Sequence, residues 1–168
     1  YEPNSPYAAS KAASDHFVRA YGQTYNLPYI ITNCGNNYGP YQFIEKFIPK
    51  VITNILTGKK IPIYGTGINI RDWVHVDDHC AAIETLLRDG VVGEKYNIGG
   101  PGPLISNTEI VKMILKIMGK DESLIVYVTD RPGHDLKYHV ETYKLEELGL
   151  EAEIALEEGL RNTIYWYI

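Results

Sequence analysis

The chain has 168 residues, an apolar share of 45% and a formal net charge of −5. This length can bury the core of one domain or form part of a larger one, and no apolar run reaches membrane-spanning length. The acidic balance argues against a nucleic-acid groove, but it allows a small anionic ligand held by a few Arg and Lys residues. Cys34 and Cys80 form neither a metal-binding spacing nor a disulfide framework, so we expect a reduced, cytoplasmic setting.

The N-terminal region predicts a long helix. The chain begins with neither Met nor a signal-peptide pattern, as expected of the later part of a longer protein. Ser5 suits the N-cap position and Pro6 the first helical position. Apolar residues then recur at four-residue spacing until about residue 26 and mark one helical face: Ala13, Phe17, Tyr21 and Tyr25.

Short strands alternate with helices along the rest of the chain. Asp77 suits a helix N-cap, Gly58 and Gly90 suit helix C-termini, and Ser106 with Glu109 forms a capping-box pattern. The alternation favours an α/β layout over a helix bundle or a β-sandwich. The expected strands are 29–32, 61–64, 73–76, 96–98 and 125–128; helices are expected at 49–58, 77–90, 106–117 and 157–167; turn-rich loops are expected at 33–40, 65–67, 99–103 and 131–135.

Tyr7 and Lys11 form the most informative pair of the sequence. Four residues apart on a helix, they lie one above the other, and an ammonium beside a phenol favours the phenolate. Such a base suits the removal of a proton from a sugar or steroid hydroxyl while hydride leaves the same carbon. The spacing alone is also common on solvated helix faces, so its interpretation depends on the other motifs.

Three further stretches accompany this pair. They read Asn-Cys-Gly-Asn-Asn-Tyr-Gly-Pro-Tyr-Gln-Phe-Ile-Glu-Lys at 33–46, Arg-Asp-Trp-Val-His-Val-Asp-Asp-His at 71–79 and Arg-Pro-Gly-His-Asp at 131–135. Together and in this order they resemble the extended short-chain dehydrogenase/reductase family, and within it the nucleoside-diphosphate-sugar 4,6-dehydratases, above all those that act on dTDP-glucose. The resemblance runs essentially from Tyr1 to Ile168 and corresponds to the C-terminal half of such an enzyme.

The resemblance implies an α/β fold in which the C-terminal part of an NAD-binding Rossmann fold is interleaved with a small α/β sugar-nucleotide-binding domain. Residues 1–35 and 72–94 would belong to the Rossmann-type part, and residues 36–71 and 95–168 to the substrate domain. The complete enzyme would use tightly bound NAD to oxidise C4 of the sugar, eliminate water and return hydride to C6. The family's Gly-rich turn and Thr-Asp-Glu stretch would lie upstream, so this chain alone is expected to be inactive.

The resemblance also assigns roles to individual residues. Tyr7 would take the proton from the sugar 4-hydroxyl, and Lys11 would assist it and bind the nicotinamide ribose. Asn37 would contact the cofactor, and Arg71 with Arg131 would clamp the diphosphate. The full set of expected substrate ligands is Asn36, Lys46, Phe47, Pro62, Ile63, Tyr64, Arg71, Asn107, Arg131 and His134.

Several alternatives stay open at this point. His75 and His79 have a four-residue spacing, but no third ligand is evident, so we expect no metal. A catalytically silent sugar-nucleotide-binding module, a related NAD-dependent nucleotide-sugar epimerase and a plain interaction domain remain alternatives to the dehydratase. The strand at 29–32 would lose upstream neighbours in such a fragment, so we expect a homodimer, or a missing N-terminal half, to cover the exposed surface.

Overall fold

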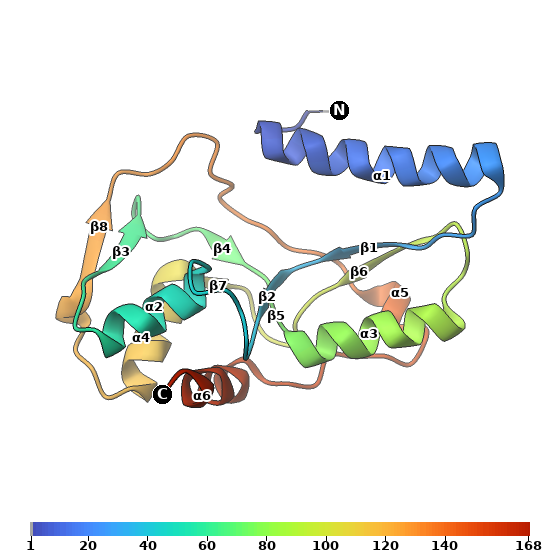
Figure 1. Cartoon of the computed structure of the whole chain (residues 1–168). Helices are drawn as coiled ribbons and strands as arrows, with labels where there is room; N and C mark the ends of the chain where they lie inside the picture. Colours follow the sequence, from blue (N-terminus) through green and yellow to red (C-terminus); the bar gives the residue numbers. More distant parts are fainter. Residues whose placement is uncertain (1) are drawn as a thin grey trace.

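The computed structural model describes residues 2–168, and helices alternate with short strands along the chain, as Figure 1 shows. This alternation confirms the α/β class. Among these residues, no helix is long and apolar enough to cross a membrane. The elements are α1 (Pro6–Tyr25), β1 (Ile31–Cys34), β2 (Asn36–Tyr38), α2 (Phe47–Leu56), β3 (Ile61–Tyr64), β4 (Ile70–Arg71), β5 (Trp73–His75), α3 (Val76–Asp89), β6 (Lys95–Ile98), β7 (Ile105–Ser106), α4 (Asn107–Ile117), the 3₁₀ helix η1 (Glu122–Leu124), β8 (Ile125–Val128), α5 (Tyr143–Glu146) and α6 (Leu156–Tyr167).

The strands pair in twos, and three of the four pairs are parallel. β1 pairs with β6, β2 with β5 and β3 with β8 in parallel, whereas β4 and β7 run antiparallel. The partners of each parallel pair are far apart in the sequence, with helices in the intervening chain. This is the arrangement expected when a strand returns to its neighbour by a helical crossover.

Gly35 is the residue at which the chain passes from one strand pair to the next. Its N–H donates to Ile98 O of β6 at 2.8 Å, and the N–H of Asn36 donates to Asp72 O at 2.6 Å. A Cβ at position 35 would lie 2.7 Å from Asp72 O, closer than a side-chain carbon approaches. Glycine therefore permits this close passage of the chain from β1 to β2, which we call the Gly35 crossing. Asn36 and Asn37 follow directly, where neighbouring strands diverge, and ligands of α/β sheets bind at such places.

Two apolar cores hold these elements together, and β5 contributes to both. Trp73 faces the larger core among α2, α4 and α6, while Val74 faces the smaller core beneath α3, because successive strand residues point to opposite faces. The larger core contains Tyr38, Ile48, Val51, Ile52, Ile55, Ile61, Ile63, Trp73, Ile110, Val111, Ile114, Leu115, Leu160 and Ile164; the smaller contains Val74, Ala82, Leu86, Tyr96, Ile98 and Leu145.

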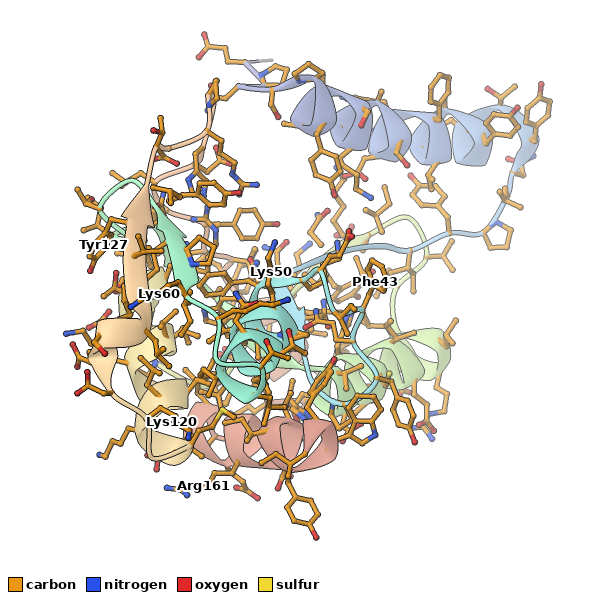
Figure 2. The ribbon with its side chains drawn as sticks, turned by 60° about the vertical axis from the view of Figure 1, so that its left-hand side comes forward. Phe43, Lys50, Lys60, Lys120, Tyr127 and Arg161 are labelled. Carbon is orange, nitrogen blue, oxygen red and sulfur yellow. The ribbon has the colours of Figure 1, made fainter. Side chains whose placement is uncertain are left out.

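Helix α1 lies apart from both cores. The predicted start is confirmed, since the Ser5 side chain accepts a hydrogen bond from the Ala8 N–H at 3.1 Å. The predicted apolar face is also present, yet Phe17, Tyr21 and Tyr25 are 66%, 55% and 69% exposed. Figure 2 shows α1 as a layer of its own above the body of the chain, on which Phe43 and Lys50 are labelled. A large aromatic surface is therefore left uncovered.

Three sequence expectations need correction. The stretch 33–40 is not a loop throughout, because 36–38 forms β2 through pairing with the distant β5. The N-cap of α3 is His75, whose side chain accepts from the Asp77 N–H, so Asp77 lies inside the first turn rather than at the cap. Helix α2 begins at Phe47 instead of Pro49, with Lys46 at its N-cap.

Candidate active site

Tyr64, the last residue of β3, carries an exposed ring at the end of a parallel strand pair. The Arg131 guanidinium lies over this ring, with Cζ 5.8 Å from the centroid, and the His134 ring meets it edge-on at 6.5 Å. These contacts orient the ring while leaving much of its surface open. The structure thus brings together three of the predicted substrate ligands, Tyr64, Arg131 and His134.

Arg71, at the end of β4, is almost completely buried and points toward the same loop. Its guanidinium donates to Ile70 O at 2.7 Å and to Asp135 O at 2.9 Å. Burial lowers the pKa of Arg71, an effect that nearby Asp135 opposes and nearby Arg131 increases. Two guanidinium groups are therefore held close enough to repel each other, and an anion with several oxygens would relieve that repulsion.

The loop at 130–135 is held by its own side chains. Asp130 Oδ1 lies 2.8 Å from His134 Nδ1 and accepts from the Arg131 N–H at 2.8 Å. The contact with His134 is the main reason that the pKa of Asp130 is lowered. Gly133 has φ +67°, and a Cβ there would lie 3.1 Å from Asn4 O. The loop therefore packs against the residues just before α1.

Tyr7 and Lys11 lie on the first turns of α1, on the part of the helix that this loop approaches. Both side chains are exposed, and neither makes a hydrogen bond or ion pair to another described residue. Burial raises the pKa of Tyr138, with smaller contributions from Cys34, Asp72 and Tyr7. The Tyr7 phenol thus lies near Tyr138. The Tyr7–Lys11 pair therefore borders the site at the ends of β3, β4 and β8.

Asn36 and Asn37 differ sharply in their surroundings. The Asn37 amide donates to Cys34 Sγ at 3.3 Å, and its Oδ1 lies 2.6 Å from His79 Nδ1. The Asn36 side chain, also half-buried, makes no hydrogen bond to another described residue. Because strand neighbours point to opposite faces, Asn36 is the one free to meet a ligand, on the face away from His79.

The other predicted ligands are spread along α2 and β3. Lys46 is exposed at the N-cap of α2, and Pro62 is half-buried within β3. The Phe47 ring packs against the larger core, and Ile63 is only 1% exposed. Phe47 and Ile63 could therefore reach a ligand only through their backbone atoms.

Asn107 opens α4 next to the strand that carries Arg71. Its N–H donates to Asn69 O at 3.0 Å, and the Asn69 side chain in turn donates to Asp135 O at 3.2 Å. The cap of α4 is Ser106, which forms the predicted capping box with Glu109. The Asn107 side chain is thus not needed as a cap and stays available at the edge of the site.

The histidines considered as metal ligands have different partners. His75 Nδ1 accepts from the Asp77 N–H at 3.3 Å, and His79 Nδ1 contacts Asn37. Within residues 2–168, no group of three His, Cys, Asp or Glu side chains is arranged to hold a metal ion. These histidines instead stabilise the start of α3 and the β2 strand.

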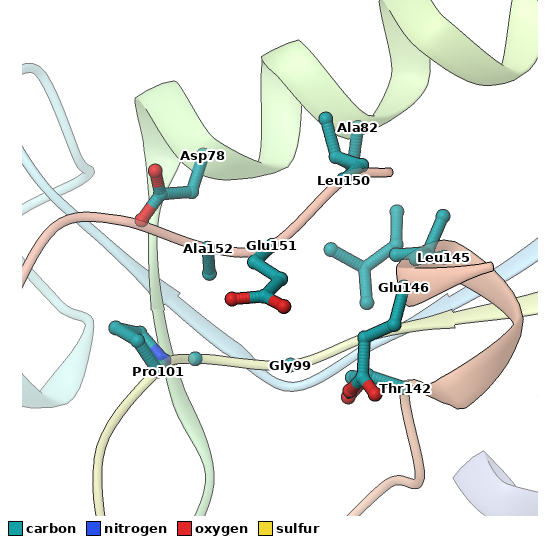
Figure 3. A pocket seen from close by; sticks show the side chains of 12 residues that line it. Asp78, Ala82, Gly99, Pro101, Thr142, Leu145, Glu146, Leu150, Glu151 and Ala152 are labelled. Carbon is teal, nitrogen blue, oxygen red and sulfur yellow. The ribbon is translucent and has the colours of Figure 1, made fainter. Parts of the chain in front are cut away.

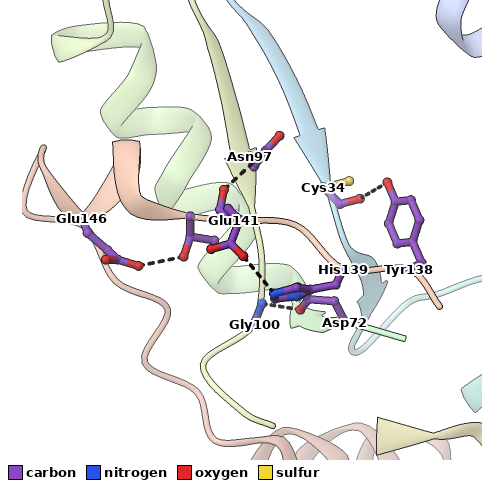
Figure 4. Close-up of polar contacts among 9 residues, drawn as sticks. Cys34, Asp72, Asn97, Gly100, Tyr138, His139, Glu141 and Glu146 are labelled. Atoms are coloured by element: carbon purple, nitrogen blue, oxygen red, sulfur yellow. Dashed lines mark hydrogen bonds and ion pairs between the residues drawn. The ribbon is translucent and has the colours of Figure 1, made fainter. Parts of the chain in front are cut away.

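Sequence reasoning missed a polar cluster around the buried Asp72 beside the site, shown in Figure 4. Asp72 Oδ1 accepts from the Gly100 N–H at 2.8 Å, and Oδ2 lies 3.3 Å from His139 Nδ1. The neighbouring Tyr138 hydroxyl donates to Cys34 O at 3.2 Å. The segment after the 130–135 loop is thereby tied to the Gly35 crossing, a relation between distant residues that no local pattern indicates.

A separate pocket lies between α3 and α5, as Figure 3 shows. It has a volume of about 370 Å³, and Asp78, Glu146 and Glu151 lie on its wall. None of the predicted ligands lines it. Its carboxylates make it a poor site for a diphosphate, so it is not the candidate active site.

The parallel α/β fold, the polar residues at the strand ends and the adjacent Tyr–Lys pair are typical of nucleotide-binding α/β proteins. The chain belongs to the NAD dependent epimerase/dehydratase family, whose model matches residues 1–99. The family resemblance expected from the motifs is therefore confirmed.

Among similar proteins of known sequence is a dTDP-glucose 4,6-dehydratase of Xanthomonas campestris pv. campestris, 52% identical over the whole of this chain and half of its own length. The dTDP-glucose 4,6-dehydratase 1 of Escherichia coli K12 is 49% identical, with 48% of its length matched. The chain spans about half the length of these relatives.

Solved structures extend the comparison to the fold. The dTDP-glucose 4,6-dehydratase DesIV of Streptomyces venezuelae, with NAD bound, superposes with a TM-score of 0.95 at 50% identity, covering 99% of this chain and 52% of that one. A UDP-glucuronic acid 4-epimerase of Bacillus cereus, in complex with UDP-glucuronic acid and NAD, gives 0.92 at 26% identity, covering 98% and 53%. These likenesses confirm the Rossmann-type α/β fold.

Proposed function

We propose that this chain supplies the Tyr–Lys pair and the sugar-nucleotide site of an NAD-dependent dTDP-glucose 4,6-dehydratase, which converts dTDP-glucose to dTDP-4-keto-6-deoxyglucose and water. The observation that carries this proposal is the cluster of Tyr64, Arg71, Arg131 and His134 around one loop that also packs against the residues just before α1. An open aromatic ring beside two guanidinium groups suits a base and a diphosphate.

The chain's own residues have distinct roles in this reaction. Tyr7 accepts the proton of the sugar 4-hydroxyl, and Lys11 lies one turn further along the same helix. Arg71 and Arg131 hold the diphosphate, and Asn36 orients the sugar side of the ligand. NAD, when bound, would supply the hydride acceptor for C4 and the hydride donor for C6. Tyr7 and Lys11 fit its ribose hydroxyls, because their exposed polar ends are not engaged by other described residues.

The complete reaction requires groups that the described residues do not supply. Elimination of water across C5 and C6 needs a further acid and base, and the dinucleotide needs a pyrophosphate-binding turn. We infer that these come from a segment corresponding to the uncovered half of the relatives. The exposed face of α1 suits contact with that segment or with a second copy in a homodimer. Two cysteines outside any disulfide support a cytoplasmic setting.

Ligand titration tests the proposal on this chain directly. We expect dTDP to bind in calorimetry and Arg71→Ala to abolish that binding, while Arg88→Ala, which removes an exposed i,i+4 pair with Glu84, leaves it unchanged. No binding of dTDP by the wild-type chain would overturn the proposal.

Complementation tests the chemistry. The chain is mixed with the separately expressed N-terminal half of a relative, NAD and dTDP-glucose, and mass spectrometry follows a product lighter by one water. Tyr7→Phe should abolish this product while leaving dTDP binding intact. Binding without product in a correctly assembled complex would favour a silent binding module, and a 4-epimer of unchanged mass would favour an epimerase.

A further inference from the structure

Asn37 is held on three sides by hydrogen bonds. Its Nδ2 donates to Cys34 Sγ at 3.3 Å and weakly to Gly35 O at 3.5 Å. Its Oδ1 lies 2.6 Å from His79 Nδ1, and its backbone carbonyl accepts from Gln42 Nε2 at 2.7 Å. Side chain and backbone of this one residue thus connect the Gly35 crossing, helix α3 and the loop after β2.

These contacts determine which imidazole nitrogen of His79 carries the proton. A carbonyl oxygen only accepts hydrogen bonds, so the amide atom that faces Gly35 O must be the donor Nδ2. Oδ1 then faces His79, and Nδ1 of His79 must carry the hydrogen that closes the 2.6 Å contact. Burial lowers the pKa of His79, which keeps the ring neutral at neutral pH. His79 is therefore the Nδ1–H tautomer.

We infer that His79 is a positioning residue: its Nδ1–H fixes the Asn37 amide, which holds the strand after Gly35 so that Asn36, on the opposite face, is presented to the sugar nucleotide. This inference rests on the proposed function for its ligand. It assigns Asn37 to the support of the site and leaves Asn36 as the side chain that meets the ligand.

Substitutions at position 79 separate this role from general helix stability. The amide of Asn places a donor at about the position of imidazole Nδ1, whereas Gln places it near Nε2. We therefore expect His79→Asn to preserve dTDP affinity and His79→Gln to weaken it by about tenfold, the effect of losing one well-placed hydrogen bond. Helix propensity predicts the reverse order, since Gln is the better helix former. Cys80→Ser, at the next and exposed position of α3, is the matched control.

The experiment combines NMR of the ligand-free chain with calorimetry. Long-range ¹H–¹⁵N spectra should show the Nδ1–H tautomer for His79, and the Asn37 side-chain amide signals should shift in His79→Gln but not in His79→Asn. An Nε2–H tautomer, or unchanged Asn37 signals in His79→Gln, would overturn the positioning role. These readouts need no ligand, so failure of the wild-type chain to bind dTDP would count against the proposed function alone.

Discussion

The Arg71 guanidinium donates to the Asp135 carbonyl at 2.9 Å, so a predicted phosphate ligand also holds the loop that carries Arg131 and His134. Asn69 donates to the same carbonyl at 3.2 Å. The position of the guanidinium and the position of this loop are therefore coupled through one side chain. A lysine could not make both contacts, because it is the planar guanidinium of arginine, with several N–H groups, that reaches two carbonyl acceptors at once.

Arg71→Lys should therefore weaken dTDP binding although the charge is kept. We expect an affinity about 10- to 100-fold lower, because a lysine provides neither the bidentate contact nor the bond to Asp135 O. Calorimetry with dTDP measures the change, and Arg88→Lys on the exposed face of α3 is the control. Equal affinities for Arg71→Lys and wild type would show that charge alone matters at this position.

Gly35→Ala should destabilise the fold at the strand crossing. The new methyl group would lie 2.7 Å from Asp72 O, and the strand would have to move away from β5. We expect the free energy of unfolding to fall by about 1–3 kcal/mol, as for other overpacked sites. Urea unfolding followed by circular dichroism measures this loss. Gly102→Ala is the control, because a Cβ at Gly102 meets no atom within 4 Å.

Local signals predicted much of this fold. The Ser5 cap, the Ser106–Glu109 capping box and the strands 61–64 and 125–128 are all present where their sequence patterns place them. Each depends on residues a few positions apart. The crossing at Gly35 was not predicted, because it depends on the backbone of Asp72, and turn-rich residues around it resemble a loop.

The candidate site was likewise predicted only in part from the sequence. The Tyr7–Lys11 pair is readable from its spacing, and the diphosphate ligands came only from the family resemblance. The contacts of Asp72 with Gly100 and His139 join segments far apart in the chain, so no window of sequence shows them. The contact of Asn37 with His79 likewise joins residues 42 positions apart.

Ser106→Ala should reduce stability in a pH-dependent way. The Ser106 hydroxyl and N–H bond to the Glu109 carboxylate and lower the pKa of Glu109. A lowered folded-state pKa gives stability that is present above the unfolded value of about 4.3 and is lost as pH falls through the folded value. We expect Ser106→Ala to cost about 1 kcal/mol at pH 7, as for other N-cap losses.

The difference in the free energy of unfolding between wild type and Ser106→Ala should become smaller in acid, as Glu109 becomes protonated. Urea unfolding at several pH values follows it. Ser14→Ala, an exposed substitution inside α1, should show no such narrowing. A difference that stays constant from neutral to acid pH would mean that the Glu109 carboxylate contributes nothing to the cap.

Helix α1 should exchange its amide hydrogens faster than α4 in the isolated chain. Gly22 is its one buried position among the described residues, whereas α4 buries Ile110, Val111, Ile114 and Leu115. A helix of this length without a packed face is only marginally stable in water, and amides in locally open segments exchange early. Hydrogen exchange measured by mass spectrometry on peptides from 6–25 and 107–117 compares the two.

The same experiment shows what covers the aromatic face of α1. Protection of 6–25 that increases with protein concentration would indicate a second copy, and protection that appears only with the N-terminal half of a relative would indicate that half. Phe17→Glu should remove either protection, because a carboxylate cannot be buried against an apolar partner without a large cost. It should leave the exchange of α4 unchanged, since Phe17 is 66% exposed and not part of either core. Strong protection of α1 at all concentrations, without any partner, would contradict the exposed position of this helix.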